Sequence, residues 1–186
     1  MAVFPADTVY GLACEPDTRE AVARLYALKG RPPAKPAAVM FFGVDLALAA
    51  LPELGAATRA ALSALLPGPV TALVPNPAQR FPLAGGGDLL GVRVPALPPS
   101  LAALEAVRWP VLQSSANHAG GPDARTLAEV PDAIRAEADL VLDGGELPGT
   151  PSTVVDLRGF ETTRDWAVVR EGALAREALR ERLSRI

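Results

Sequence analysis

The 186-residue sequence predicts an α/β fold. Short valine- and leucine-rich runs of strand type alternate with alanine-, leucine- and arginine-rich stretches of helical type, which favours this class over a helix bundle or a β-sandwich. Hydrophobic residues make up 49% of the chain, enough to bury a sizeable core. The length and the absence of an internal repeat favour a single domain over residues 1–186.

The predicted strands begin with a short apolar run around Val3, which a polar loop follows at once. Later strands are expected where β-branched and other apolar residues run between glycine, proline or polar residues. These strands cover residues 37–42, 70–74, 89–94, 111–113, 140–142, 153–156 and 167–169.

The predicted helices fit between these strands. The clearest covers residues 18–28, where Ala21, Val22, Leu25 and Leu28 recur at helical spacing. The others cover residues 57–66, 100–106, 127–136 and 174–185. Glycine- and proline-rich clusters at 67–69, 85–87 and 144–151 are too short for domain linkers, so we expect loops at strand ends, where open α/β sheets usually bind ligands.

Composition excludes several classes of protein. A net charge of −3 and a pI near 5.2 do not favour tight, sequence-independent binding to a nucleic acid backbone, so any bound anion needs a local pocket. The single cysteine, Cys14, forms no internal disulfide and completes no zinc pattern, which is typical of a cytoplasmic protein. The longest uncharged run, 60–79, is broken by prolines, and no secretory signal opens the chain, so we expect no membrane segment.

The only two lysines, Lys29 and Lys35, lie in one proline-rich stretch, LKGRPPAKP. A helix that ends near residue 28 delivers Lys29 and Arg31 into a loop whose conformations the prolines limit. Cations held this close repel one another unless an anion lies opposite, and an ammonium beside a guanidinium suits a polyphosphate. The alternative is a solvated basic turn, since cations also favour helix C-termini.

A second constellation is QSSANHAGGP, residues 113–122. Small hydrogen-bonding side chains, among them Ser115 and Asn117, follow a strand and precede two glycines, an arrangement that suits a phosphate or carboxylate. An ordinary Ser/Asn/Gly turn is the alternative. We expect His118, the only histidine, to be an incidental loop residue rather than a catalytic base, because no partner motif accompanies it.

Arg93 lies inside a predicted strand, between Val92 and Val94. Strand geometry sends the valines to one face and the arginine to the other. One alternative is that this second face is exposed to solvent. The other is that it is buried, and Arg93 then needs an internal acid or a bound carboxylate. Two further groups of polar residues stand at strand ends, Ser152 in TPSTVVD and Arg170 in VVREG. No phosphate loop, dinucleotide fingerprint, HExxH or GxSxG motif is present, so a nucleotide would need an unusual site.

Together these stretches resemble the threonylcarbamoyl-AMP synthase (YrdC-like) family in its single-domain form. The resemblance covers nearly the whole chain through six ordered motifs, FPADTVYGLACEPDTREAVARLYALKGRPPAKPAAV, PGPVTALV, GVRVP, SSANHAGGP, PSTVVD and VVREG. It implies a twisted open sheet of mixed parallel and antiparallel strands with flanking helices around a deep cationic cavity. The implied activity is that of a nucleotidyltransferase that joins L-threonine, bicarbonate and ATP, with Mg²⁺ carried by ATP, into threonylcarbamoyl-AMP and pyrophosphate for tRNA modification.

The resemblance also assigns roles to single residues. The pairs K-x-R and S-x-N, predicted to handle phosphate and so to be catalytic, correspond to Lys29, Arg31, Ser115 and Asn117. Further nucleotide contacts are expected from Lys35, at a place where relatives often carry asparagine, and from Arg170. The positions that match threonine-binding residues are Thr8, Arg93, Gln113 and Ser152. No metal ligand, general base or covalent nucleophile is implied for the protein itself.

Two family positions differ in this chain: Ala6 replaces the usual threonine and Met40 a common histidine, changes that bear on threonine binding. The N-terminus is also expected to be shorter than the family norm. The implied partners are proteins that transfer threonylcarbamoyl to tRNA, with weak or no direct tRNA binding and no membrane. The alternatives are a carbamoyl-adenylate-forming paralogue and a non-catalytic RNA-binding module; the acidic pI and the 5% aromatic content argue against the second.

Overall fold

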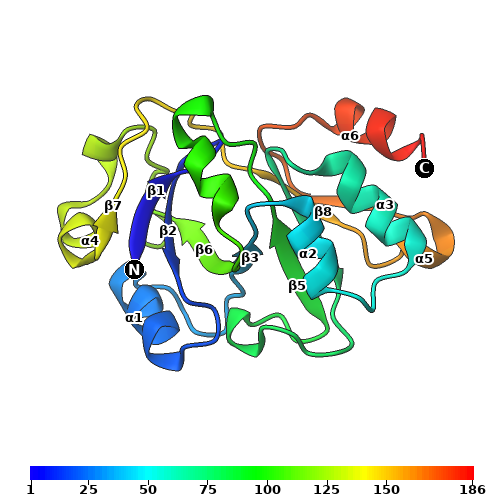
Figure 1. Ribbon diagram of the computed structural model, residues 1–186, viewed down its shortest axis with the longest axis horizontal. Coiled ribbons are helices and arrows are strands. Elements are labelled where there is room, and N and C mark those ends of the chain that lie inside the picture. The colour runs from blue at the N-terminus through cyan, green and yellow to red at the C-terminus, as the bar shows by residue number, and fades with distance from the viewer.

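A computed structural model describes residues 1–186 and contains one nine-stranded sheet, with the strand order β7-β1-β2-β6-β3-β5-β4-β8-β9. Three pairs are parallel (β1 with β7, β3 with β5, β4 with β8) and the other five are antiparallel. The predicted mixed sheet is therefore confirmed. The two chain termini lie on opposite sides of the molecule (Figure 1).

The first half of the sheet contains a strand that the sequence did not predict. β1 (Ala2–Pro5) is followed by a turn of only four residues, and the chain then returns as β2 (Tyr10–Cys14), antiparallel to β1. All five residues of β2 are buried, so no polar alternation marks it as a strand, and the expected polar loop was too long. β6 (Val111–Ser115) pairs with β2, and the short edge strand β7 (Leu140–Val141) pairs with β1.

The other strands agree with the prediction to within a few residues. They are β3 (Ala38–Met40), β4 (Val70–Pro75), β5 (Leu89–Arg93), β8 (Thr153–Asp156) and β9 (Ala167–Arg170). β3 lies between β5 and β6, so segments that are far apart in the chain meet at the middle of the sheet.

The helices depart from the prediction where proline intervenes. α1 (Arg19–Lys29) is confirmed and ends at Gly30, whose left-handed φ of 60° is one that glycine adopts at little cost. The expected helix at 127–136 is split into η3 (Leu127–Glu129) and α4 (Asp132–Glu137), because Pro131 lies between them. The one at 100–106 is the 3₁₀ helix η2 (Pro99–Ala106), which has prolines at its start.

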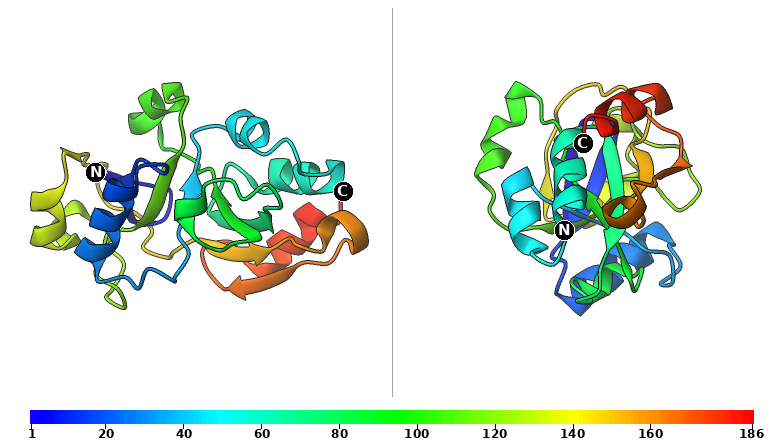
Figure 2. Two further views of the ribbon diagram at one scale, coloured as in Figure 1. Left: turned by 90° about the horizontal axis from the view of Figure 1, so that it is seen from below. Right: turned by 90° about the vertical axis from the view of Figure 1, so that its right-hand side faces the viewer.

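Three short helices were not predicted: α2 (Val44–Ala50), η1 (Pro82–Ala84) and α5 (Phe160–Thr163). The remaining helices, α3 (Ala56–Leu65) and α6 (Arg176–Leu183), match predicted ones. In the right-hand view of Figure 2, α2 (cyan), α3 (teal) and η2 (green) lie on the same side of the sheet. No helix is both long and apolar enough to cross a membrane.

The two faces of β4 show how the sheet separates core from site. Val70, Ala72 and Val74 have no exposed surface and belong to the main core cluster of 37 buried residues. Thr71 and Leu73, which alternate with them, point to the opposite face and line a cavity. At β4 the main core therefore lies on one face of the sheet, and the polar cavity described below opens on the other.

Candidate active site

A single cavity of about 430 Å³ is lined by every residue for which the sequence predicted a substrate contact. These residues come from both halves of the chain: Thr8, Lys29, Arg31, Lys35, Arg93, Gln113, Ser115, Asn117, Ser152 and Arg170. The structure therefore brings together all ten predicted positions, although the roles assigned to them stay predictions.

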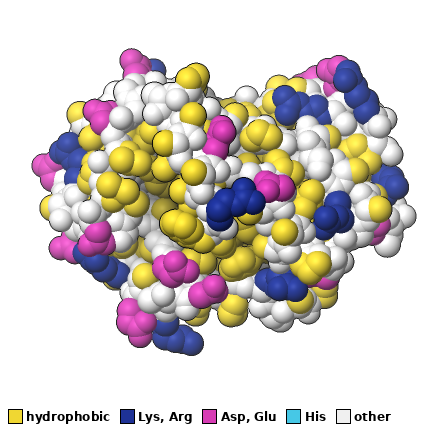
Figure 3. Space-filling model, in the orientation of Figure 1, with side chains coloured by type: hydrophobic (Ala, Val, Ile, Leu, Met, Phe, Trp, Pro, Cys, Tyr) yellow, Lys and Arg dark blue, Asp and Glu magenta, His cyan; other side chains and the backbone are white.

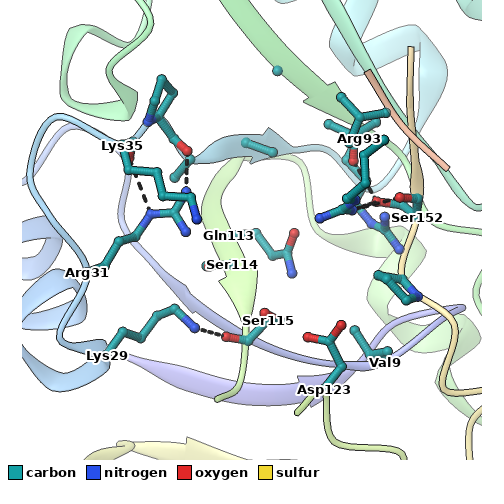
Figure 4. A pocket seen from close by; sticks show the side chains of 18 of the residues that line it. Val9, Lys29, Arg31, Lys35, Arg93, Gln113, Ser114, Ser115, Asp123 and Ser152 are labelled. Atoms are coloured by element: carbon teal, nitrogen blue, oxygen red, sulfur yellow. Dashed lines mark hydrogen bonds between the residues drawn. The ribbon is translucent and has the colours of Figure 1, made fainter. Parts of the chain in front are cut away.

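The cavity has two polar ends separated by a floor of small side chains. Strand register places Gln113 beside Ala38 and Ala38 beside Gly91, so little side-chain bulk rises from the centre of the sheet. Figure 4 shows the basic residues of the loop after α1 on one side of this floor, and Arg93 with Ser152 on the other. An elongated ligand with an anionic group at each end fits this arrangement.

Lys29 is the most deeply buried cation at the first end, with 2% of its surface exposed. Its ammonium donates hydrogen bonds to the backbone carbonyl of Ser115, to the backbone carbonyl of Asn117 at 2.5 Å and to Asn117 Oδ1 at 3.1 Å. Burial, followed by the nearby charges of Arg31 and Lys35, lowers the pKa of Lys29 to about 8 in spite of an opposing effect from Asp123. A solvated basic turn, the alternative left open by the sequence, is therefore wrong for Lys29.

The S-x-N segment is organised around that ammonium. Ser115 Oγ donates to Asn117 Oδ1 at 2.7 Å, and Asn117 Nδ2 donates to the carbonyl of Gly121 at 2.7 Å. The K-x-R and S-x-N pairs are thus joined directly, although more than eighty residues separate them in the chain. An ordinary surface turn, the alternative for this segment, is also wrong, because Asn117 is buried.

Arg31 stiffens the loop that carries it. Its Nε donates to the carbonyl of Lys35 at 3.2 Å, its Nη2 donates to the carbonyl of Pro36, and its guanidinium lies 5.7 Å from the ring centroid of Tyr26. The side chain of Lys35 stays exposed at the cavity wall. The prolines and Arg31 together hold three cations at one end of the cavity.

Arg93 forms the second end and is 3% exposed, so the exposed-face interpretation is wrong. Its Nη2 donates to Asp7 Oδ1 at 2.5 Å and to Thr8 Oγ1 at 2.7 Å, which makes Asp7 the internal acid that a buried arginine requires. Burial lowers the pKa of the guanidinium and the Asp7 carboxylate acts in the opposite direction. Nε of Arg93 is buried without any hydrogen-bond partner.

Ser152 is held beside Arg93 by residues from two other strands. Arg170 Nη2 donates to the backbone carbonyl of Ser152 at 2.7 Å and to its Oγ at 3.2 Å, and Thr71 Oγ1 lies 2.9 Å from the same Oγ. Gly172 allows this packing, because a Cβ there would lie 2.3 Å from the carbonyl oxygen of Pro151 and 2.6 Å from the carbonyl carbon of Ser152. The segment before β8 could not otherwise approach this closely.

The lining residues that the sequence interpretation missed include two with polar side chains, Thr71 and Asp123. Thr71 could have been found from the alternation of side chains along the predicted strand 70–74, which places it on the face opposite Val70, whereas Asp123 gave no signal in its glycine-rich loop. Asp123 is the only carboxylate among the lining residues, against five lysine and arginine side chains. In a chain of net charge −3, this excess of positive charge concentrates attraction for anions in one place.

Other candidate positions lie outside the cavity lining. His118 is exposed and is not a lining residue, in agreement with an incidental role. Ala6 and Met40, the two departures from the family pattern, pack in one small buried cluster with Phe4 and Ala13 and do not line the cavity. No group of three or more histidine, cysteine, aspartate or glutamate side chains could hold a metal ion.

Residues 1–172 match the protein family described as telomere recombination, the Sua5/YciO/YrdC domain. The chain belongs to the Sua5/YciO/YrdC family. Two similar relatives are the proteins named threonylcarbamoyl-AMP synthase of Chromohalobacter salexigens, 41% identical over 88% of this chain and 89% of that protein, and of Xanthomonas campestris, 37% identical over 87% and 89%. The family expected from the six motifs is therefore confirmed.

Solved structures agree with this membership of the Sua5/YciO/YrdC family. Sua5 of Pyrococcus abyssi in complex with L-threonine superposes with a TM-score of 0.83 at 28% identity, over 97% of this chain and 53% of that one. Escherichia coli YciO gives a TM-score of 0.76 at 25% identity, over 96% and 85%. The chain thus spans about half the length of the Pyrococcus protein, and the expected fold is confirmed.

Proposed function

We propose that this protein is a threonylcarbamoyl-AMP synthase, a nucleotidyltransferase that converts L-threonine, bicarbonate and ATP into threonylcarbamoyl-AMP and pyrophosphate. The observation that carries the proposal is the single cavity with a cationic group at each end, Lys29, Arg31 and Lys35 at one and Arg93 with Arg170 at the other. The names of relatives up to 41% identical support the same activity.

We assign ATP to one end of the cavity and threonine to the other. In this proposal the triphosphate lies against Lys29, Arg31 and the Ser115–Asn117 segment, where fixed positive charge stabilises the phosphoryl oxygens and the departing pyrophosphate. The threonine carboxylate lies against the guanidinium of Arg93, whose Nη1 donates to no acceptor in the protein. This arrangement directs the threonine amine toward the centre of the cavity and the α-phosphorus.

The chemistry then requires positioning more than proton transfer by the protein. The threonine nitrogen attacks the carbon of bicarbonate with loss of water, and an oxygen of the resulting N-carboxylate attacks the α-phosphorus as the bond to pyrophosphate breaks. Neither step calls for a covalent nucleophile on the chain. Burial of the reacting groups also protects the labile carbamate from water.

Mg²⁺ is proposed as part of the substrate MgATP. Beside the cationic groups the cavity offers one carboxylate, Asp123, and hydroxyl groups such as that of Ser115, a donor set suited to touch a metal that ATP phosphates already hold. When bound, the ion would neutralise charge on the phosphate oxygens.

The product would supply the threonylcarbamoyl group of modified adenosine in tRNA through transfer proteins, in the cytoplasm. RNA binding as the primary function is not favoured, because the chain is acidic overall and basic side chains are interspersed with acidic ones on the face shown in Figure 3. A carbamoyl-adenylate-forming paralogue would use the same phosphate end with a different acceptor, so substrate dependence distinguishes it.

The test is pyrophosphate release by the purified protein with MgATP and bicarbonate, with L-threonine present, omitted or replaced by serine. Release that depends on both threonine and bicarbonate is expected. Lys29→Ala should abolish most of it, and Arg158→Ala, which removes an exposed arginine outside the cavity, is the matched control. ATP binding without threonine-dependent release would reject the proposal, and RNA binding that persists at physiological salt with ATP present would favour the binding module.

A further inference from the structure

Asp7 is the buried counter-ion of Arg93. The two side chains are 8% and 4% exposed, and Asp7 Oδ1 lies 2.5 Å from Arg93 Nη2. A guanidinium in such a place requires a fixed anion, because an unpaired buried charge is strongly destabilising. Any nearby acidic side chain could balance the charge of Arg93. Whether Asp7 has a further role therefore depends on its other contacts.

Those contacts fix an orientation as well as a charge. Asp7 Oδ2 accepts a hydrogen bond of 3.0 Å from the backbone N–H of Ala96, in the segment just beyond β5. The loop after β5 therefore holds Asp7 Oδ2, and Asp7 Oδ1 in turn holds Arg93 of β5. Arg93 Nη2 also donates to Thr8 Oγ1 at 2.7 Å, so this nitrogen is fully committed to protein acceptors.

One donor of Arg93, Nη1, is left for a ligand. Nε is buried without a partner, and Nη1 donates to no acceptor in the protein. Arg93 lines the cavity, whereas Asp7 does not. A carboxylate that enters the cavity would therefore meet a guanidinium whose direction is set from behind by Asp7.

We propose that Asp7 is a positioning residue for the amino-acid substrate: it holds the guanidinium of Arg93 in the orientation that receives the substrate carboxylate. This inference rests on the proposed function, in which Arg93 binds threonine. Asp7 acts through Arg93 and never touches the substrate. Its loss would misdirect the arginine without removing it, so the effect falls on threonine and spares ATP at the opposite end.

The experiment measures the KM for threonine in pyrophosphate release and the Kd for MgATP by calorimetry, for Asp7→Asn, Arg93→Lys and the double variant. Asp7→Asn should raise the threonine KM about tenfold or more and change the MgATP Kd by less than about twofold. The double variant should be no worse than Arg93→Lys alone, because one residue acts through the other. The matched control is Asp156→Asn, which removes a 13%-exposed carboxylate paired with Arg158 outside the cavity.

Three results would overturn the proposal: an unchanged threonine KM in Asp7→Asn, parallel losses of threonine and MgATP binding with a lower melting temperature, or additive effects in the double variant. If Asp7→Asn does not fold, Asp7→Glu is measured instead, because it keeps the charge but displaces the carboxylate. A wild-type threonine KM in Asp7→Glu would also overturn the proposal. Failure of the proposed function is seen separately in the wild type. Threonine that binds without turnover would reject the synthase, while its Kd in the variants still decides the role of Asp7.

Discussion

The protonation of Lys29 should control ATP affinity near pH 8. Its ammonium is 2% exposed and makes hydrogen bonds with three acceptors, and burial lowers its pKa from 10.5 to about 8. A triphosphate beside it favours the charged form, so binding takes up a proton whenever the free protein holds neutral Lys29. Affinity for ATP should therefore fall as the pH rises through about 8.

The size of this fall follows from the pKa. With a value of about 8, roughly nine-tenths of Lys29 is charged at pH 7 and roughly one-tenth at pH 9, so the MgATP Kd should rise about tenfold over this interval. The ATP affinity should thus fall as the pH rises, whereas the free energy of unfolding of the ligand-free protein should increase. Between the folded pKa of about 8 and the unfolded value of 10.5 the unfolded chain binds more protons, so this group makes folding more favourable as the pH rises.

Calorimetric titration with MgATP in the absence of threonine measures the affinity without interference from the substrate amine. Lys29→Met, of similar shape but without charge, should bind weakly at every pH, while Lys35→Arg, a change at an exposed cation of the same loop, should keep the wild-type pH dependence. Lys29→Ala should also reduce turnover about 10²-fold or more. A wild-type Kd that is constant from pH 7 to pH 9, or an equal rise in Lys29→Met, would refute the reasoning.

Three further predictions address other parts of the structure. Arg93→Ala removes a buried charged group, so the threonine KM should rise by the equivalent of about 2–5 kcal/mol with an unchanged MgATP Kd, and steady-state kinetics that show equal losses for both substrates would contradict the two-ended site. Gly172→Ala would push a Cβ to within 2.3 Å of the Pro151 carbonyl oxygen, so we expect a lower melting temperature together with weaker threonine binding; wild-type values of both would show that the segment around Ser152 can move aside. Leu62→Ala creates a cavity in the core, away from the site, and should cost about 2–5 kcal/mol in denaturant unfolding while ATP binding stays normal at low temperature.

Local sequence patterns determined the features that depend on neighbouring residues. The helical spacing of residues 18–28 predicts α1 and therefore places Lys29 at its end, because periodicity follows directly from helix geometry. The order of the six motifs identified the family and all ten predicted lining residues. These inferences required no knowledge of strand order.

Sheet register decided what the sequence left open. β2 was missed because it is buried on both faces, and the exposure of Arg93 depended on whether its face of β5 met solvent or Asp7. The sequence predicted binding residues in the loops at strand ends, but the cavity also covers the face of the sheet. The glycine- and proline-rich cluster at 67–69 does not line the cavity.

The sequence by itself therefore determined the family, the mixed α/β class and the identity of the predicted substrate-binding residues. Only the tertiary structure decided that Lys29 binds the Ser115–Asn117 segment, that Asp7 faces Arg93, and that Thr71 and Asp123 join the cavity. The reason is physical: periodicity reports the conformation and burial of one segment, whereas contacts between distant segments depend on which strands pair and in which register.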